Sequence, residues 1–177
     1  RRGRRRDAST ESLLVARSAG TLMDAWAPVR RCFLRRDAAG WDLLPEIELP
    51  PMAQMLKTRS GEVRLKLYLT VLWLAAAPPY AVRNKPAQAW ARLFGLTEPD
   101  SLGSIRVRTA IDWLAQNNFL TATRGRGAAP TLVLKLERGG GDYTRPTGSK
   151  EIVDRYLQVP QQVWSGGWIA VLSGPAI

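Results

Sequence analysis

The fold is decided by three apolar helical stretches, VRLKLYLTVLWLAA (Val63–Ala76), PAQAWARLF (Pro86–Phe94) and LGSIRVRTAIDWLAQN (Leu102–Asn117). Gly95 and Leu96 follow the second stretch, and glycine permits the left-handed backbone that ends many helices. Two β-prone runs come after the third stretch, Phe119–Thr123 and Thr131–Glu137, and the basic loop RGRG joins them. Glycines in such a loop allow the tight tip of a β-hairpin. The sequence therefore predicts an α+β fold that is mainly helical, with one small β-hairpin.

The order of these elements is typical of a winged helix-turn-helix, in which the third helix enters the major groove of DNA. At 100° per residue, one apolar stripe runs along this helix and is predicted to face the core; it consists of Val107, Ala110, Ile111 and Leu114. The rest of the helix carries Arg106, Arg108 and Thr109, while Ser101 and Ser104 lie at its start. Arginine bonds both acceptors of guanine, and hydroxyl groups bond phosphates or base edges. We expect these five residues to contact DNA, the alternative being ordinary solvated side chains.

Further basic residues lie on either side of this helix in the sequence. Arg83 and Lys85 come just before the proline that opens the second helix, so they are candidates for phosphate contacts or for solvated side chains. Arg124 and Arg126 lie in the hairpin loop, where they would enter a minor groove or straddle phosphates. The alternative for this loop is a plain surface hairpin that uses glycine for its turn and arginine for solubility.

The chain of 177 residues has a formal net charge of +11, which predicts a polyanionic partner. Residues 57–136 carry 12 Lys/Arg against 4 Asp/Glu, and residues 1–45 carry 10 against 5. The longest apolar run, Leu67–Tyr80, is interrupted by Thr70 and is shorter than the roughly 20 residues that span a bilayer. Positive charge on the expected reading elements favours double-stranded DNA over a membrane surface.

The residue types that most often carry catalysis are scarce. Histidine is absent and Cys32 is the single cysteine, which excludes histidine-based triads, histidine metal sites and intrachain disulfides. Asp and Glu occur without the clustering that a metal site requires. The sequence thus predicts a protein that is not an enzyme and uses neither a metal nor a cofactor. A single free cysteine fits a reducing cytoplasm.

Three segments are expected along the chain: a basic N-terminal arm with helices at 1–45, the winged helix-turn-helix at 46–137, and a linker at 138–177 with the start of a possible second winged-helix unit. In the arm, Arg1–Arg6 is either a solvated tail or a phosphate-contacting extension. Helices are predicted over Glu11–Trp26 and Pro28–Arg36. This front region either packs on the central unit or serves as a dimer arm.

The last segment echoes the start of the central one. Tyr156–Pro160 resembles Glu46–Pro50, and Ile169–Leu172 resembles the start of another apolar helix. The repeat predicts an incomplete second unit, and hence a chain that is part of a longer protein. The alternative is a C-terminal segment that closes over the first domain.

From Ile47 to Glu137 the sequence resembles winged-helix DNA-binding regulators of actinobacteria. The stretches that carry this resemblance are Leu65–Ala76, Trp90–Leu96, Arg106–Leu114 and Phe119–Leu136. The repeated Leu/Val-Pro segment before a helix is also similar to plasmid replication initiators, which place two winged helices in tandem. The resemblance implies sequence-specific binding of double-stranded DNA without catalysis, by a dimer or a tandem assembly. The expected role is transcriptional regulation or, alternatively, replication initiation on a plasmid or other mobile element; a non-catalytic protein interaction module is the alternative from another class.

Overall fold

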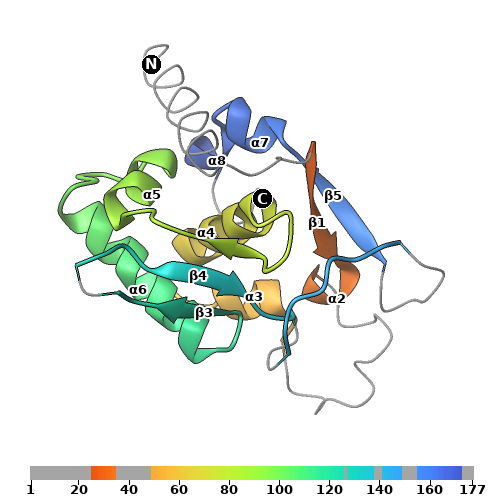
Figure 1. The fold of residues 1–177 in the computed structure, drawn as a ribbon. Helices are drawn as coiled ribbons and strands as arrows, with labels where there is room; N and C mark the ends of the chain where they lie inside the picture. The colour runs from red at the N-terminus through yellow and green to blue at the C-terminus, as the bar shows by residue number, and fades with distance from the viewer. Residues whose placement is uncertain (1–24, 35–48, 126, 138–140, 149–154, 173–177) are drawn as a thin grey trace.

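The computed structural model describes residues 25–34, 49–125, 127–137, 141–148 and 155–172 (Figure 1). Their elements in chain order are β1 (Trp26–Arg30), α2 (Arg31–Leu34), α3 (Pro51–Leu56), α4 (Gly61–Leu74), β2 (Ala81–Val82), α5 (Ala87–Leu93), α6 (Leu102–Gln116), β3 (Leu120–Thr123), β4 (Thr131–Leu134), β5 (Tyr156–Pro160), α7 (Gln162–Ser165) and α8 (Trp168–Val171). These helices and two small antiparallel sheets make the described part of the chain an α+β structure, the class predicted from the sequence. None of the helices within these ranges is long and apolar enough to cross a membrane.

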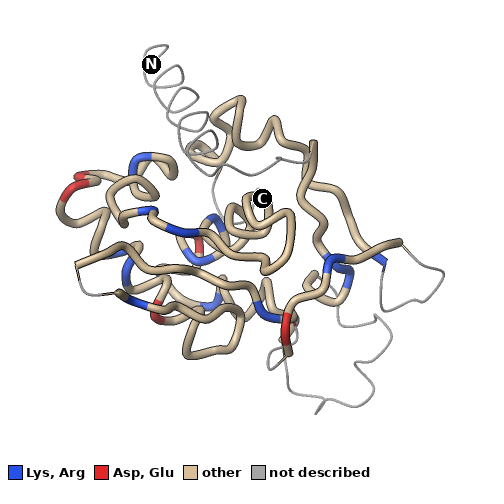
Figure 2. The backbone as a smooth tube through the Cα atoms, in the orientation of Figure 1, with Lys and Arg blue, Asp and Glu red and all other residues tan. Residues whose placement is uncertain are grey.

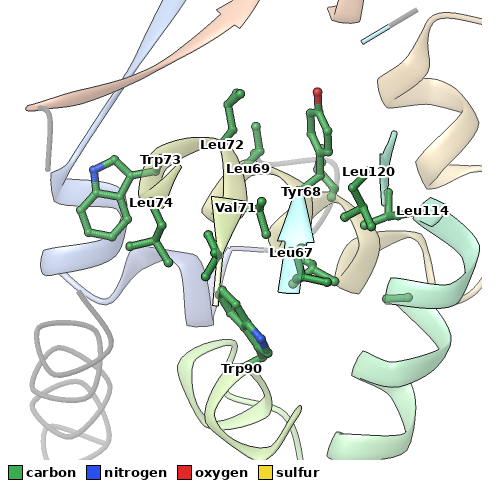
Figure 3. Packing of buried hydrophobic residues seen from close by; sticks show 14 of the residues in the cluster. Leu67, Tyr68, Leu69, Val71, Leu72, Trp73, Leu74, Trp90, Leu114 and Leu120 are labelled. Atoms are coloured by element: carbon green, nitrogen blue, oxygen red, sulfur yellow. The ribbon is translucent and has the colours of Figure 1, made fainter. Parts of the chain in front are cut away.

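Helix α4 forms the centre of the fold. Every residue from Val63 to Leu74 is buried. Figure 3 shows its side chains projecting in several directions, toward Trp90 of α5 and toward Leu114 of α6 and Leu120 of β3. A helix that is largely apolar on all sides is expected in the interior of a domain. The helix predicted from residue 63 onward is therefore confirmed, and it ends at Leu74.

Two basic residues of α4 are buried with it and have partners inside the protein. The Nη1 atom of Arg64 donates to Oγ1 of Thr58 at 2.6 Å, and its guanidinium lies 4.3 Å from the centroid of the Trp113 ring. The Nζ atom of Lys66 pairs with Oε1 of Glu62, one turn earlier in the helix, at 2.6 Å. These contacts explain how two cations are accommodated in the core, because a buried charge requires a partner that replaces water.

The predicted hairpin is confirmed, and it belongs to a sheet of three strands in the order β2-β4-β3. Strand β3 pairs antiparallel with one edge of β4, and β2 pairs with its other edge, where Ala81 lies opposite Val133. Leu132 and Leu134 are buried and alternate with half-buried residues along β4, so one face of the sheet covers the core. Strand β2 is not predictable from the sequence, because two residues are too few to show an alternating pattern.

The second sheet joins the two ends of the described chain. Strands β1 and β5 pair antiparallel along their five residues each, and Trp26 stacks on Tyr156 with ring centroids 5.3 Å apart. The guanidinium of Arg30 forms a buried ion pair with Glu137 at 2.7 Å and donates to the backbone oxygen of Thr144. These contacts attach the β1–β5 ribbon to the chain that follows β4.

Helices α7 and α8 pack on the same core (Figure 1). Trp164 of α7 is fully buried, stacks on Trp73 with centroids 4.6 Å apart, and donates from Nε1 to Oγ1 of Thr70 at 2.9 Å. Helix α8 lies against the turn after α5, because a Cβ added at Gly95 would lie 3.1 Å from the Cβ of Ala170. The members of this hydrophobic cluster extend along the described chain from Ala27 in β1 to Ile169 in α8. The described C-terminal residues therefore pack on the core that α4, α5 and α6 form.

The structure corrects the prediction for the front of the chain. The helix predicted over Pro28–Arg36 is wrong up to Arg30, because Trp26–Arg30 form β1 and only Arg31–Leu34 are helical. Pairing with β5, far away in the sequence, overrides the local helical pattern here. Trp26 is likewise a strand residue and not the end of the helix predicted over Glu11–Trp26. Residues 11–24 of that predicted helix and the Arg1–Arg6 run lie outside the described residues.

Candidate nucleic-acid interface

Helix α6 packs on α4 and α5 with one face and leaves the other exposed. The stripe predicted from the 100° repeat is confirmed as buried; it consists of Val107, Ala110, Ile111 and Leu114. Gly103 is buried at the start of the helix, where an added Cβ would lie 3.2 Å from the Cβ of Ala91. The absence of a side chain at Gly103 therefore allows α5 and α6 to approach closely.

The outward face of α6 carries two cations that the described protein does not neutralise. Arg106 and Arg108 are exposed, as is Thr109. Among the residues that the structure describes, no Asp or Glu forms an ion pair with either arginine. At 100° per residue the two arginines lie on opposite flanks of this face, with Thr109 between them. A partner lying along α6 would therefore meet a cation on each side.

The hydroxyl of Thr109 already has a partner within the helix. It donates to the backbone oxygen of Ile105 at 3.1 Å, a bond that exposed threonines in helices commonly form. A hydroxyl group also has two acceptor lone pairs, so Thr109 can accept a bond without giving up this contact. An amino group of adenine or cytosine supplies such a donor in the major groove.

Two of the residues predicted to contact DNA are buried. Ser104 is 1% exposed, and its hydroxyl donates to the backbone oxygen of Ser101 at 2.8 Å, so it stabilises the first turn of α6. Lys85 is 7% exposed, and burial lowers the pKa of its ammonium group. The exposed residues at this place are instead Arg83 and Asn84. The structure thus removes Ser104 and Lys85 from the surface that could meet DNA.

Ser101 is exposed at the start of α6, beside two carboxylates. Its hydroxyl donates to Oε2 of Glu98 at 3.0 Å, while Oδ1 of Asp100 pairs with Nη2 of Arg92 at 2.6 Å. Both acids lie in the turn between α5 and α6 and are exposed there. The excess positive charge of this face consequently lies on the helix and not in the turn that precedes it.

The β3–β4 hairpin is joined to α6 by an ion pair. Arg124, just after β3, bonds through Nη2 to Oδ1 of Asp112 at 2.6 Å, and both side chains are more than half exposed. Exposed pairs of this kind contribute about 0–1 kcal/mol, so a phosphate can replace Asp112 as the partner of Arg124. Figure 1 shows the hairpin and α6 on the same side of the view. Arg126, the other predicted tip residue, lies outside the described residues.

Sequence reasoning missed two apolar residues on the same face of α6. Leu102 is 57% exposed and Ile105 is 50% exposed, although both are large aliphatic side chains. The 100° projection that identifies the buried stripe also places Ile105 opposite it. The sequence pattern therefore contained this signal. The structure adds that no described element covers these two side chains.

Basic residues also outnumber acidic ones along the chain around α6. Figure 2 shows Lys and Arg recurring on the segment from β2 to the β3–β4 hairpin, where they outnumber the Asp and Glu residues by six to three over residues 81–125. Within the described ranges, no group of three or more His, Cys, Asp or Glu is arranged to hold a metal ion. The chemistry that this face offers is hydrogen bonding, positive charge and aliphatic contact.

Comparison with known protein families finds no match to this chain, and searches of curated proteins and of solved structures find no similar protein. Any assignment of function therefore depends on the geometry of the described residues. That geometry combines an outward helix face, two unneutralised arginines and an adjacent hairpin cation.

Proposed function

We propose that residues 61–134 form a winged helix-turn-helix. The element order α4-β2-α5-α6-β3-β4 and the strand order β2-β4-β3 support this assignment. In it, α5, the following turn and α6 supply the helix-turn-helix, and the β3–β4 hairpin supplies the wing. Helix α6 is then the recognition helix, because it packs on the core with one face and is exposed on the other.

We propose further that this unit binds double-stranded DNA at specific sequences. The observation that carries this proposal is the outward face of α6, where Arg106 and Arg108 have no carboxylate partner among the described residues. With α6 in the major groove, an arginine donates to both O6 and N7 of a guanine, which contributes about 1–3 kcal/mol of discrimination. Arg124 exchanges Asp112 for a backbone phosphate beside the groove and so fixes the register of the complex.

The role that fits binding without catalysis is transcriptional regulation at a specific site. The alternative role is replication initiation on a plasmid or other mobile element, where the protein binds iterated origin sites. The symmetry of the bound sequence distinguishes these roles. A palindrome indicates a dimeric regulator, since its two-fold axis matches that of the protein, whereas direct repeats favour an initiator.

Selection of bound duplexes from a random DNA pool tests the proposal. We expect one sequence motif to be enriched. The affinity for the enriched duplex should fall by about 0.9 log unit per log unit of salt for each phosphate contacted. Arg155→Ala, at an exposed position beside β5 and away from α6 in the chain, is the control and should retain the motif. Failure to enrich any motif, or an unchanged motif in Arg106→Ala and Arg108→Ala, would contradict the proposal.

A non-catalytic protein interaction module is the second candidate function. The exposed aliphatic side chains of Leu102 and Ile105 favour it, since apolar surface is commonly buried at protein interfaces. A protein partner that buries these side chains would dissociate only weakly with added salt, in contrast to a duplex held through several phosphates. The same salt titration therefore separates the two candidates.

A further inference from the structure

We propose that Leu102 and Ile105 read thymine in the bound duplex by burying its C5-methyl group. The inference rests on the proposed function, and it adds a chemical determinant of the site that the arginines of α6 do not supply. Thymine is the base that presents an apolar group in the major groove, and aliphatic side chains contact that group. The expected site therefore contains thymine next to the guanine that an arginine bonds.

The placement of the two side chains supports this inference. Leu102 and Ile105 are 57% and 50% exposed, and three residues apart on a helix they lie on the same face. They occupy the N-terminal half of α6 (Leu102–Gln116), which is the part of a recognition helix that reaches base edges. Arg106 and Thr109, each four residues after one of them, extend the same face.

The surroundings of this apolar pair favour a base over a protein as its occupant. Two side chains form a far smaller apolar surface than the roughly 800 Å² that each partner contributes to a stable protein interface. The centres of protein interfaces are also depleted of charge, whereas here Arg106 and Arg108 lie on the two flanks. A duplex satisfies both features at once, since its phosphates pair with cations and its major groove presents methyl groups.

Replacement of thymine by deoxyuridine provides a direct test, because it removes the C5-methyl group and leaves base pairing intact. The probe is the duplex selected from the random pool, with each thymine replaced in turn. Loss of one buried methyl group should weaken wild-type binding about fourfold at one or two positions. In Ile105→Ala and Leu102→Ala the same replacements should have little further effect, since the partner of the methyl group is gone.

Matched controls separate this effect from damage to the fold. Leu157→Ala removes an equally exposed aliphatic side chain from β5 and should retain full sensitivity to deoxyuridine. Ile105→Val, which keeps a branched aliphatic side chain, should retain most of it. Equal thermal stability of all variants would show that the exposed substitutions leave the core intact.

The possible failures are distinguishable. A selected duplex that binds with steep salt dependence, but shows no deoxyuridine effect in the wild type, would overturn the thymine inference and leave DNA binding in place. Deoxyuridine sensitivity that persists unchanged in both Leu102→Ala and Ile105→Ala would overturn it as well. If no duplex is enriched at all, the proposed function fails and the inference fails with it.

Discussion

Helices α4 and α6 have similar lengths and carry the same charge pattern, yet they use it in opposite ways. Helix α4 has Arg64 and Lys66 two residues apart, and α6 has Arg106 and Arg108 with the same spacing. In α4 both cations are buried and are bound by the protein itself. In α6 both are exposed, and neither pairs with a carboxylate of the described residues. The role of a basic pair is thus set by whether other elements cover its helix.

Covering α4 requires elements from both ends of the described chain. Trp164 stacks on Trp73 and donates to Thr70, so α7 covers one side of the helix. Strand β1, helix α6 and the three-stranded sheet contact α4 as well. No comparable element among the described residues covers the outward face of α6, which is exposed.

Removing the side chain through which α7 covers α4 should produce the largest loss of stability. Trp164→Ala removes a fully buried side chain, and substitutions of this kind reduce the free energy of unfolding by about 3–5 kcal/mol. Trp168→Ala, at an exposed position of α8, is the matched control and should reduce it by about 1 kcal/mol. Urea denaturation followed by circular dichroism measures both. Equal losses in the two variants would show that α7 does not stabilise the core as described.

Removing the buried arginine of α4, compared with removing an exposed arginine of α6, should give the next largest difference in the free energy of unfolding. Arg64→Ala removes the hydrogen bond to Thr58 and the contact with the Trp113 ring, so we expect a loss of about 1–3 kcal/mol in the free energy of unfolding. Arg106→Ala, at an exposed position, should change it by no more than about 0.5 kcal/mol. The order of these losses would be reversed if Arg106, and not Arg64, were the structural cation.

Alkaline pH should lower the free energy of unfolding through two buried tyrosines. Burial, together with the negative charge of Glu137, raises the pKa of Tyr68 and of Tyr143 above the usual value. The unfolded chain therefore loses these protons above about pH 10 while the folded protein keeps them, so stability falls as pH rises through that range. Each tyrosine contributes a slope of about 1.4 kcal/mol per pH unit.

The variant Tyr68→Phe isolates this effect. The Tyr68 hydroxyl is buried with no hydrogen-bond partner among the described residues, so its removal should leave the free energy of unfolding nearly unchanged at pH 7. Between pH 10 and 11 the free energy of unfolding should fall less steeply with pH in the variant than in the wild type. The difference corresponds to the release of about one proton fewer on unfolding. Parallel curves in guanidinium denaturation over this range would argue against a buried, neutral Tyr68.

The sequence contains enough local information to predict the helices and hairpin of the central unit. The stretch around α4 has almost no polar face, which indicates burial, and α6 has a clear apolar stripe. The β1–β5 ribbon is different, because its stability comes from pairing between segments far apart in the chain. Trp26–Arg30 shows no local signal that distinguishes a strand from the start of a helix.

The candidate site is predictable to the same extent. The 100° repeat correctly places Arg106, Arg108 and Thr109 outside the core. The same repeat places Ser104 beside Val107 and Ile111, on the buried side, so expecting a DNA contact from its position at the start of the helix was wrong. The repeat cannot detect the burial of Lys85, which lies in the loop before α5. Loop residues have no periodicity from which their exposure could be inferred.

Removing the ion pair between the hairpin and α6 should produce the smallest effect, a change in DNA affinity. Asp112→Asn removes a negative charge from the outward face and releases Arg124 from its partner, so we expect DNA binding to become about two- to fivefold tighter. Asp142→Asn, which releases Lys135 beyond β4 in the same way, is the control and should leave binding unchanged. Weaker binding in Asp112→Asn would indicate that the pair positions Arg124 for its contact.

The most direct test of α6 as a reading helix compares the wild type with the double variant Arg106→Ala/Arg108→Ala on two DNAs. One is the selected duplex, and the other is a scrambled duplex of the same length and composition. Fluorescence anisotropy at one fixed salt concentration measures both affinities. We expect the double variant to lose about 30-fold or more on the selected duplex and only a few-fold on the scrambled one. Equal losses on both duplexes, in a variant that unfolds like the wild type, would contradict base reading by α6.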